Sequence, residues 1–181
     1  MLIIGFTGLP SSGKDAACDH LVNNFGFKFL SCGDVVRAFA RDVHGDHKPT
    51  RAKLQEIGQT MRVKEGPHWV LKRLVDGLPE GRYVISGVRG VKELEFLKDT
   101  FKDEFALVGV LACRKTRFRR CLARGRSGDP TTPEGFVQAD MDDLKLGDGE
   151  STILSDFFVM NEKDGLDVYG REIERVLNGI I

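Results

Sequence analysis

The strongest chemical signal in the sequence is a glycine-rich stretch near its start, Gly8-Leu9-Pro10-Ser11-Ser12-Gly13-Lys14. It follows an apolar run at residues 2–6 and precedes a segment with helical periodicity that begins at Asp15. This order of strand, glycine-rich turn and helix is typical of a phosphate-binding loop, where backbone N–H groups, the helix start and the lysine converge on phosphate oxygens. We predict that a nucleoside triphosphate binds here, at Gly8, Pro10, Ser11, Ser12, Gly13 and Lys14.

The residue after the lysine departs from the usual motif. That position normally carries a Ser or Thr whose hydroxyl coordinates Mg²⁺, and here it is Asp15. Two roles stay open for Asp15: it holds Mg²⁺ directly or through water, or it stabilises the helix start while waters and phosphates hold the ion. A third hypothesis is that the site binds nucleotide without metal-dependent turnover.

Length and composition set broad limits. The 181 residues suit a single domain, residues 1–181, with room for an inserted lid or subdomain. Lys plus Arg and Asp plus Glu number 27 each, so no overall field attracts nucleic acid or an anionic membrane. This balance argues against nucleic acid and against a membrane as partners. The partner that we expect is a small-molecule phosphate acceptor, and the expected state is a monomer or weak homo-oligomer.

The cysteines and the apolar runs indicate a compartment. The four cysteines, Cys18, Cys32, Cys113 and Cys121, form no C-x-x-C pair, which favours reduced thiols over disulfides or a zinc site. No apolar run approaches the length of a membrane span, and the start of the chain has the pattern of a buried strand rather than of a signal peptide. We expect a cytoplasmic protein.

Short apolar runs alternate with helical segments along the chain. The expected strands are residues 2–6, 27–31, 83–87, 106–112 and 157–160. The expected helices are residues 15–25, 35–44, 51–65, a helix from residue 67, and residues 91–100, 114–126, 133–146 and 166–177. The extra helices between the second and third strands predict a projecting subdomain. The pattern predicts an α/β three-layer sandwich with a five-stranded, largely parallel sheet, whose ligands bind at the strand carboxyl ends.

A polar group follows each expected strand: Lys14, then Asp34 and Arg37, then Arg89, then Arg114 and Arg117, then Asn161. Phosphoryl transfer requires cations around the transferred oxygens and a carboxylate that orients the nucleophile. We predict anion binding at Arg37 and Arg89, with surface ion pairing as the alternative. For Asp34, catalysis and capping of the following helix both stay open.

A basic helix precedes a polar segment rich in Gly and Pro, residues 127–133, that is typical of a mobile flap or a turn. Arg120 and Arg124 are four residues apart and share a helical face, and Arg126 stands at the end of the expected helix. These arginines are placed to fold over a triphosphate and exclude water. The alternative is a solvated helix whose arginines serve solubility.

Several of these segments together resemble the P-loop nucleoside monophosphate kinase superfamily: GLPSSGK at residues 8–14, CGDVVR at 32–37, SGVR at 86–89 and RFRRCLARGRSGDP at 117–130. The chain is most similar to dephospho-CoA kinase-like and archaeal adenylate-kinase-related proteins, nearly end to end. The stretch from Thr50 to Trp69 also resembles deoxynucleoside monophosphate kinases and animal-type phosphomevalonate kinase, in which a Gly-Lys-Asp loop is similarly found.

The resemblance implies a P-loop kinase fold with an acceptor-binding helical subdomain at residues 34–77 and a lid at residues 120–133. It implies ATP and Mg²⁺ as cofactors, ATP contacts from Arg120, Arg124 and Arg126, and acceptor contacts from Asp34, Arg37, Arg62 and Arg89. Ser86 stands where many relatives have an Asp that organises Mg²⁺. Either Asp15 and Asp34 take over the metal, or activity is low.

The leading hypothesis is an ATP-dependent phosphotransferase that moves the γ-phosphoryl group to a nucleotide-type acceptor. The candidate acceptors are a nucleoside or deoxynucleoside monophosphate and dephospho-CoA, and the candidate catalytic residues are Lys14, Asp34, Arg89 and Arg124. Two rival hypotheses are an ATP-binding regulatory protein and a simple NTPase that transfers the phosphoryl group to water.

Overall fold

The computed structural model describes residues 1–126, 128–163 and 165–180. The strands are β1 (Leu2–Thr7), β2 (Lys28–Ser31), β3 (Arg82–Ser86), β4 (Phe105–Leu111) and β5 (Phe157–Met160). The helices are α1 (Lys14–Phe25), α2 (Cys32–His44), α3 (Arg51–Glu65), α4 (Trp69–Val75), α5 (Gly90–Phe101), the 3-10 turn η1 (Lys102–Glu104), α6 (Arg114–Arg124), α7 (Pro133–Lys145), α8 (Asp148–Ile153) and α9 (Leu166–Leu177).

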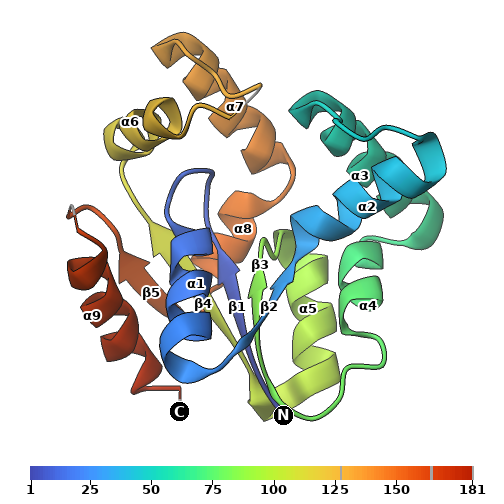
Figure 1. Ribbon diagram of the computed structural model, residues 1–181. Helices are drawn as coiled ribbons and strands as arrows, with labels where there is room; N and C mark the ends of the chain where they lie inside the picture. Colours follow the sequence, from blue (N-terminus) through green and yellow to red (C-terminus); the bar gives the residue numbers. More distant parts are fainter. Residues whose placement is uncertain (127, 164, 181) are drawn as a thin grey trace.

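The five strands form one sheet in the order β2-β3-β1-β4-β5, and each neighbouring pair is parallel (Figure 1). Their carboxyl ends therefore meet at a single edge, where β1 runs into the glycine-rich turn. In open α/β sheets, ligands bind in the crevice outside this edge. The predicted five-stranded parallel sheet is confirmed.

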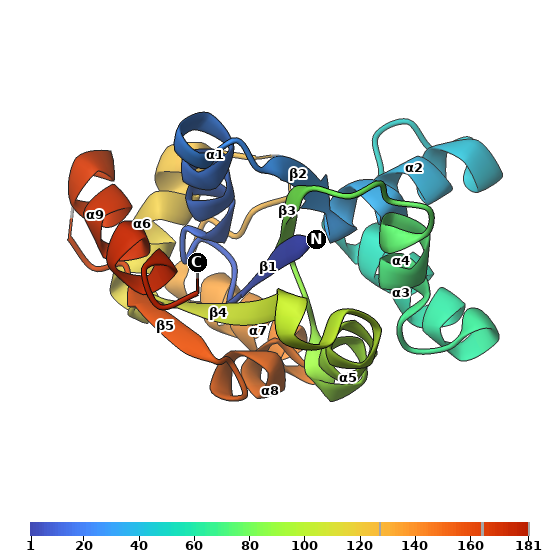
Figure 2. The same cartoon turned by 90° about the horizontal axis from the view of Figure 1, so that it is seen from below.

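Helices cover both faces of the sheet, with α1 and α9 on one side and α5 and α8 on the other (Figure 2). Because successive side chains of a strand point to opposite faces, Ile3 of β1 packs in the core on the α5 side, while its neighbour Ile4 packs against α1 and α9. Burial on both faces explains why the central strands are nearly continuous apolar runs. The rigid three-layer core places the turn after β1 at a fixed edge.

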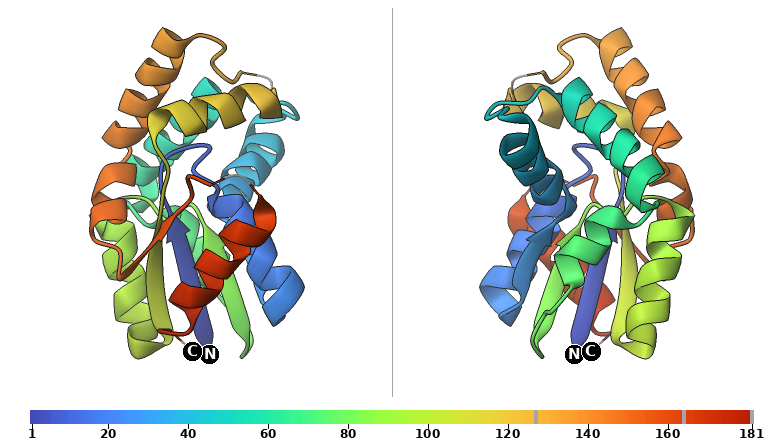
Figure 3. Two further views of the ribbon diagram at one scale, coloured as in Figure 1. Left: turned by 90° about the vertical axis from the view of Figure 1, so that its left-hand side faces the viewer. Right: turned by 90° about the vertical axis from the view of Figure 1, so that its right-hand side faces the viewer.

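Helices α2 and α3 form one group that rises beyond the carboxyl edge of the sheet, and α6 and α7 form another, while α4 lies lower, beside α5 (Figures 1 and 3). Helices α2, α3 and α4 pack on one another beside β2 and β3, around a buried Trp69 whose ring lies 5.6 Å from that of Phe39. Helices α6 and α7 stand on the other side of the turn, joined by the segment predicted as a lid. Ser127 of that segment lies outside the described residues.

The observed helices differ from the predicted ones in several bounds: α4 begins at Trp69 and not at residue 67, and α6 ends at Arg124 and not at residue 126. Two further differences concern residues near the site. Helix α2 begins three residues earlier than expected because the Ser31 hydroxyl accepts a hydrogen bond from the backbone N–H of Asp34 (3.2 Å) and caps the helix. Asp34 therefore lies inside the first turn, and its predicted alternative role as the cap is wrong. Helix α8 was not predicted, because its buried side chains include the polar Asp148, Ser151 and Thr152 and leave no apolar periodicity.

The four cysteines are free, and three of them are buried, which agrees with the expectation of reduced thiols. Within the three described ranges, none of the helices combines the length and the apolar character that crossing a membrane requires.

Candidate functional site

The turn between β1 and α1 has the backbone shape of a phosphate-binding loop. Gly8, Ser11 and Gly13 have positive φ angles of 140°, 62° and 107°. A Cβ at Gly8 would lie 2.5 Å from the carbonyl oxygen of Val110, and one at Gly13 would collide with the side-chain amide of Asn161. Both positions therefore require glycine for its backbone freedom and for its lack of a side chain.

Side chains from the far end of the sequence hold this loop from outside. The Asn161 amide donates to the carbonyl oxygen of Ser12 (2.8 Å), and the Tyr169 hydroxyl donates to that of Gly13 (3.1 Å). Among the described residues, the buried hydroxyls of Ser11 and Ser12 have no hydrogen-bond partner. Of the two, Ser11 lines the cavity. A buried polar group without a partner often marks the place of a ligand or water, so the Ser11 hydroxyl suits a phosphate oxygen.

Lys14 is the first residue of α1 and lines a cavity above the loop. Burial lowers the pKa of Lys14, while the carboxylates of Asp148 and Asp15 act in the opposite direction. A nearby anion favours the charged form of a lysine. A phosphate group in the cavity would therefore relieve the cost of holding this cation out of water.

The cavity has a volume of about 620 Å³ and lies between the two groups of helices that rise above the sheet edge. Its lining includes eight cations, Lys14, Arg37, Arg51, Arg62, Arg89, Arg120, Arg124 and Arg126. The same lining includes four carboxylates, Asp15, Glu93, Asp129 and Asp143. The excess of positive charge in the lining, in a protein with no net charge, suits this cavity to anions.

Arg89 follows β3 and is held by two carboxylates. Its Nε lies 3.4 Å from Oδ1 of Asp148, and its backbone N–H donates to Glu93 (2.8 Å). Burial opposes the charge on Arg89, but the surrounding carboxylates, chiefly Asp148, outweigh it and raise the pKa of this guanidinium. Glu93 also accepts a hydrogen bond from Arg62 (3.0 Å), and burial raises the pKa of its carboxyl. Arg62 and Arg89 are thus oriented together beside the cavity.

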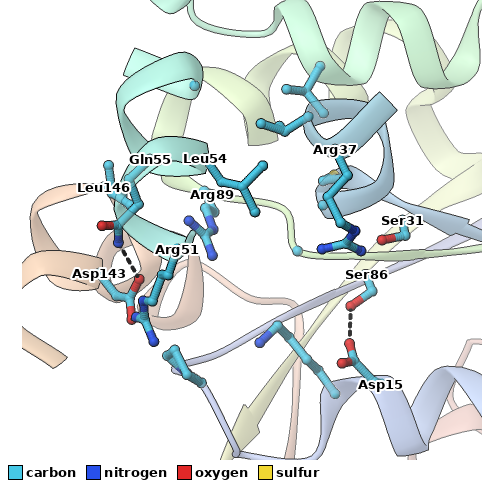
Figure 4. Close-up of a pocket in the computed structure, with 18 of the residues that line it drawn as sticks. Asp15, Ser31, Arg37, Arg51, Leu54, Gln55, Ser86, Arg89, Asp143 and Leu146 are labelled. Carbon is cyan, nitrogen blue, oxygen red and sulfur yellow. Dashed lines mark hydrogen bonds and ion pairs between the residues drawn. The ribbon is translucent and has the colours of Figure 1, made fainter. Parts of the chain in front are cut away.

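Three polar side chains that meet at the cavity wall were not among the site residues predicted from the sequence. Arg51 of α3 forms an ion pair with Asp143 of α7, and Gln55 also donates to Asp143 (3.4 Å) (Figure 4). A signal for Asp143 existed in the sequence, because it lies on the same helical face as the apolar Phe136, where a carboxylate is costly unless it is paired. Asp148 gave no such signal because α8 was not predicted.

The structure does not bring Asp34 to the cavity. Its side chain is 64% exposed and accepts a hydrogen bond from Nε of Arg37 (3.1 Å). Arg37 itself lines the cavity, and its guanidinium points into it (Figure 4). The structure therefore places Arg37 where the sequence predicted it, and it places Asp34 behind that arginine.

The three arginines predicted to contact ATP from the lid all line the cavity. Arg120 donates to the backbone carbonyl of Asn161 (2.9 Å) and to its side-chain oxygen (3.2 Å). Arg124 forms a two-point ion pair with Asp129 (3.0 and 2.8 Å), and the backbone N–H of Arg126 also donates to Asp129 (3.2 Å). Asp129 thus organises the turn that follows α6, and the basic helix is not merely a solvated surface.

Arg117 was expected among the polar groups that follow the strands at the ligand-binding edge, and the structure corrects this expectation. It is buried, does not line the cavity, and forms a two-point ion pair with Asp140 of α7 (2.6 and 2.7 Å). Arg114 joins the same carboxylate from the surface (3.3 Å), and it too lies outside the cavity lining. Both arginines hold α6 against α7 and do not face a ligand.

Asp15 and Ser86 meet across the cavity floor. The Ser86 hydroxyl at the end of β3 donates to Oδ1 of Asp15 (2.7 Å) (Figure 4). Carboxylate and hydroxyl oxygens suit Mg²⁺, which prefers hard oxygen ligands and keeps several waters and phosphate oxygens around it. In the described ranges, no group of three or more His, Cys, Asp or Glu residues is placed to hold a metal. The chemistry of this pair therefore suits a Mg²⁺ ion that arrives with nucleotide.

The fold and the loop define a P-loop domain with the architecture of small-molecule kinases. A shikimate kinase from Acinetobacter baumannii in complex with shikimate has a TM-score of 0.64 at 16% identity, covering 99% of this chain and 94% of that chain. A gluconokinase from Sinorhizobium meliloti 1021 has a TM-score of 0.61 at 15% identity, covering 99% and 93%. At these identities the likeness concerns the fold alone.

The sequence comparisons agree with this class. A profile described as an AAA domain matches residues 7–136, and a P-loop domain of this kind implies nucleotide binding. The chain is 32% identical to the UPF0200 protein of Pyrobaculum aerophilum, covering 97% of this chain and 96% of the relative. It is 34% identical to that of Aeropyrum pernix, covering 97% and 93%. The chain belongs to the UPF0200 family.

Proposed function

We propose that this protein is an ATP-dependent phosphotransferase that moves the γ-phosphoryl group to a small phosphorylated acceptor. One observation carries the proposal: a single cavity joins a phosphate-binding loop to a second cluster of arginines, Arg37, Arg51, Arg62 and Arg89. A protein that only bound ATP would have no use for a second anion site facing the loop. The named solved structures support the proposal, since both are kinases of small molecules.

The residues that line the cavity form two groups, one that binds the nucleotide and one that binds the acceptor. The loop amides and Lys14 hold the β- and γ-phosphates, and Arg120, Arg124 and Arg126 contact the nucleotide from the lid. Arg89 and Arg37 hold the anionic group of the acceptor, and Arg62 supports Arg89 through Glu93. Mg²⁺ bound with ATP would neutralise charge on the phosphates. Positioning of two anions in one cavity supplies most of what phosphoryl transfer requires.

Asp34 has a positioning role in this proposal. Its carboxylate accepts a hydrogen bond from the Arg37 guanidinium, one helical turn away, and orients that guanidinium toward the cavity. The catalytic residues that contact ATP, acceptor or the transferred group are then Lys14, Arg89 and Arg124, which all line the cavity.

The acceptors that the charge pattern favours carry a phosphate or comparable anion. A nucleoside monophosphate, a deoxynucleoside monophosphate and dephospho-CoA each have such a group, and the arginine cluster suits it through bidentate hydrogen bonds. Coupled ADP release with Mg·ATP against these acceptors, phosphomevalonate, shikimate and gluconate tests the proposal. Acceptor-dependent ADP is the expected result. Equal ADP release with water alone would indicate an NTPase, and ATP binding without ADP release a regulatory protein.

Arg89→Ala is expected to separate acceptor binding from ATP binding. Removing a half-buried, ion-paired guanidinium that faces the acceptor should lower kcat/KM for the acceptor by roughly 10²- to 10³-fold, while ATP affinity changes by less than about 3-fold. Steady-state kinetics with each substrate varied in turn, together with ATP titration, measure this split.

Arg82→Ala is the matched control, because Arg82 is exposed at the opposite end of β3. It should leave both parameters unchanged. A loss of ATP affinity in Arg89→Ala with no change in the acceptor parameters would place Arg89 on the nucleotide side and contradict the assignment.

A further inference from the structure

The contact between Asp15 and Ser86 has the chemistry of a P-loop magnesium site with its two groups exchanged. P-loop proteins generally hold Mg²⁺ with a Ser or Thr hydroxyl that directly follows the loop lysine, together with an Asp elsewhere in the site. In this chain the residue after Lys14 is the carboxylate, and the hydroxyl comes from the end of β3. Both functional groups are therefore present. The carboxylate stands where the hydroxyl usually is, and the hydroxyl stands where the carboxylate usually is.

The sheet fixes the two residues close to each other. Ser86 is the last residue of β3 and pairs in register with Phe6 of β1, so it lies beside the strand that leads into the loop. Asp15 stands in the first turn of α1, directly after that loop. Both residues line the cavity, and Ser86 is buried. This position does not depend on a flexible segment.

The hydrogen-bond partner of Asp15 shows where its carboxylate is directed. Among the described residues, the hydrogen bond of its carboxylate is with the Ser86 hydroxyl on β3, and not with a backbone N–H of α1 (Figure 4). The charge of Asp15 in the first turn of α1 stabilises the helix start without any hydrogen bond, so the carboxylate does not need to point at those N–H groups. The carboxylate instead points across the cavity floor toward a second oxygen ligand.

The spacing of the two oxygens suits a small octahedral ion. They lie 2.7 Å apart. Two adjacent ligands of Mg²⁺ at its usual distance of about 2.0–2.1 Å are separated by about 2.9 Å. A small outward movement of the side chains would therefore let one ion replace the hydrogen bond, with water and phosphate oxygens as the remaining ligands.

We infer that Asp15 and Ser86 form the protein's half of a Mg²⁺ site in which the carboxylate and the hydroxyl have exchanged sequence positions. The inference rests on the proposed nucleotide binding, because the triphosphate supplies the other ligands. It has a specific consequence: moving the carboxylate to position 86 and a hydroxyl to position 15 should restore the site, although each change alone alters it.

The experiment uses four proteins: the wild type, Asp15→Asn, Asp15→Ser and the double variant Asp15→Ser/Ser86→Asp. Free Mn²⁺ is counted by electron paramagnetic resonance during titration of each protein saturated with the ATP analogue AMPPNP, so the readout does not depend on turnover. AMPPNP affinity is measured separately in EDTA, which shows whether each variant still folds and binds nucleotide.

Asp15→Asn and Asp15→Ser are expected to weaken Mn²⁺ binding by at least about 10-fold, since each removes the one charged protein ligand. Their AMPPNP affinity in EDTA should not fall. The double variant should bind Mn²⁺ within about 3-fold of the wild type.

Two results would overturn the inference while the proposed function stands: Mn²⁺ affinity unchanged in Asp15→Asn, or a double variant no better than Asp15→Ser when both bind AMPPNP. Absence of AMPPNP binding by the wild type in both EDTA and Mn²⁺ would overturn the inference together with the proposed function.

Discussion

Lys14→Ala is expected to abolish measurable phosphoryl transfer and to weaken ATP binding strongly. Lys14 is the cation at the start of α1, and the loop around it leaves two buried hydroxyls without partners among the described residues. Losing one preorganised group that stabilises transition-state charge commonly lowers turnover by 10²- to 10³-fold. Because Lys14 also binds the ground-state phosphates, we expect kcat/KM to fall by roughly 10³-fold or more.

The measurement is kcat/KM for the acceptor found in the panel, with ATP affinity from direct titration. Lys14→Met retains the length of the side chain without its charge and should behave like Lys14→Ala, which separates lost charge from lost packing. Lys72→Ala, at an exposed position of α4, is the control and should match the wild type. A Lys14→Ala protein with an unchanged rate would contradict the whole assignment of the loop.

Asp140→Asn is expected to produce the largest loss of stability. Arg117 and Asp140 join α6 to α7 through two hydrogen bonds of 2.6 and 2.7 Å, and their side chains are 5% and 3% exposed. Breaking a buried ion pair by neutralising one partner leaves an uncompensated charge and typically costs about 3–5 kcal/mol. We expect the free energy of unfolding to fall by about that amount in chemical denaturation.

Two further variants show whether the loss of stability in Asp140→Asn comes from the unpaired charge of the buried Arg117. Arg114→Ala removes the exposed arginine that reaches the same carboxylate, and it should cost less than about 1 kcal/mol. Arg117→Met/Asp140→Leu removes both buried charges and should recover much of the stability lost in Asp140→Asn. If Asp140→Asn unfolds at the same denaturant concentration as the wild type, the ion pair of Arg117 with Asp140 does not stabilise the packing of α6 on α7.

The phosphate-binding loop was predictable because its information is local. The glycines, the lysine and the flanking strand and helix occupy one short stretch, and the backbone angles of Gly8 and Gly13 are those that the motif requires. The sheet was predictable for a similar reason, since each buried strand is a short apolar run between helical segments. The strand order brought Arg37 and Arg89 to the expected edge.

The partners of the arginines were not predictable from spacing. Asp34 stood after a strand like the others, yet a hydrogen bond to Ser31 drew it into a helix turn, and its carboxylate turned to Arg37. Asp148 holds Arg89 from a helix that has no apolar stripe. Side-chain pairing across distant segments depends on tertiary packing, which the sequence periodicity does not encode.

The same limit applies to Asp15 and Ser86. In the sequence they are two separate departures from a motif, 71 residues apart, and each alone suggests a weakened metal site. In the structure they form one contact, a hydrogen bond between a hydroxyl and a carboxylate. Parallel pairing of β3 with β1 makes the difference, because it places the end of one strand beside the loop that follows the other.

The most direct test of the central claim is the fate of labelled phosphate from [γ-³²P]ATP in the presence of Mg²⁺ and each candidate acceptor. We predict that the label appears on one anionic acceptor and that Lys14→Ala and Arg89→Ala both lose this product. Label that appears only as inorganic phosphate, or that stays on ATP while the protein binds it, would contradict the claim that the second arginine cluster receives a phosphoryl acceptor.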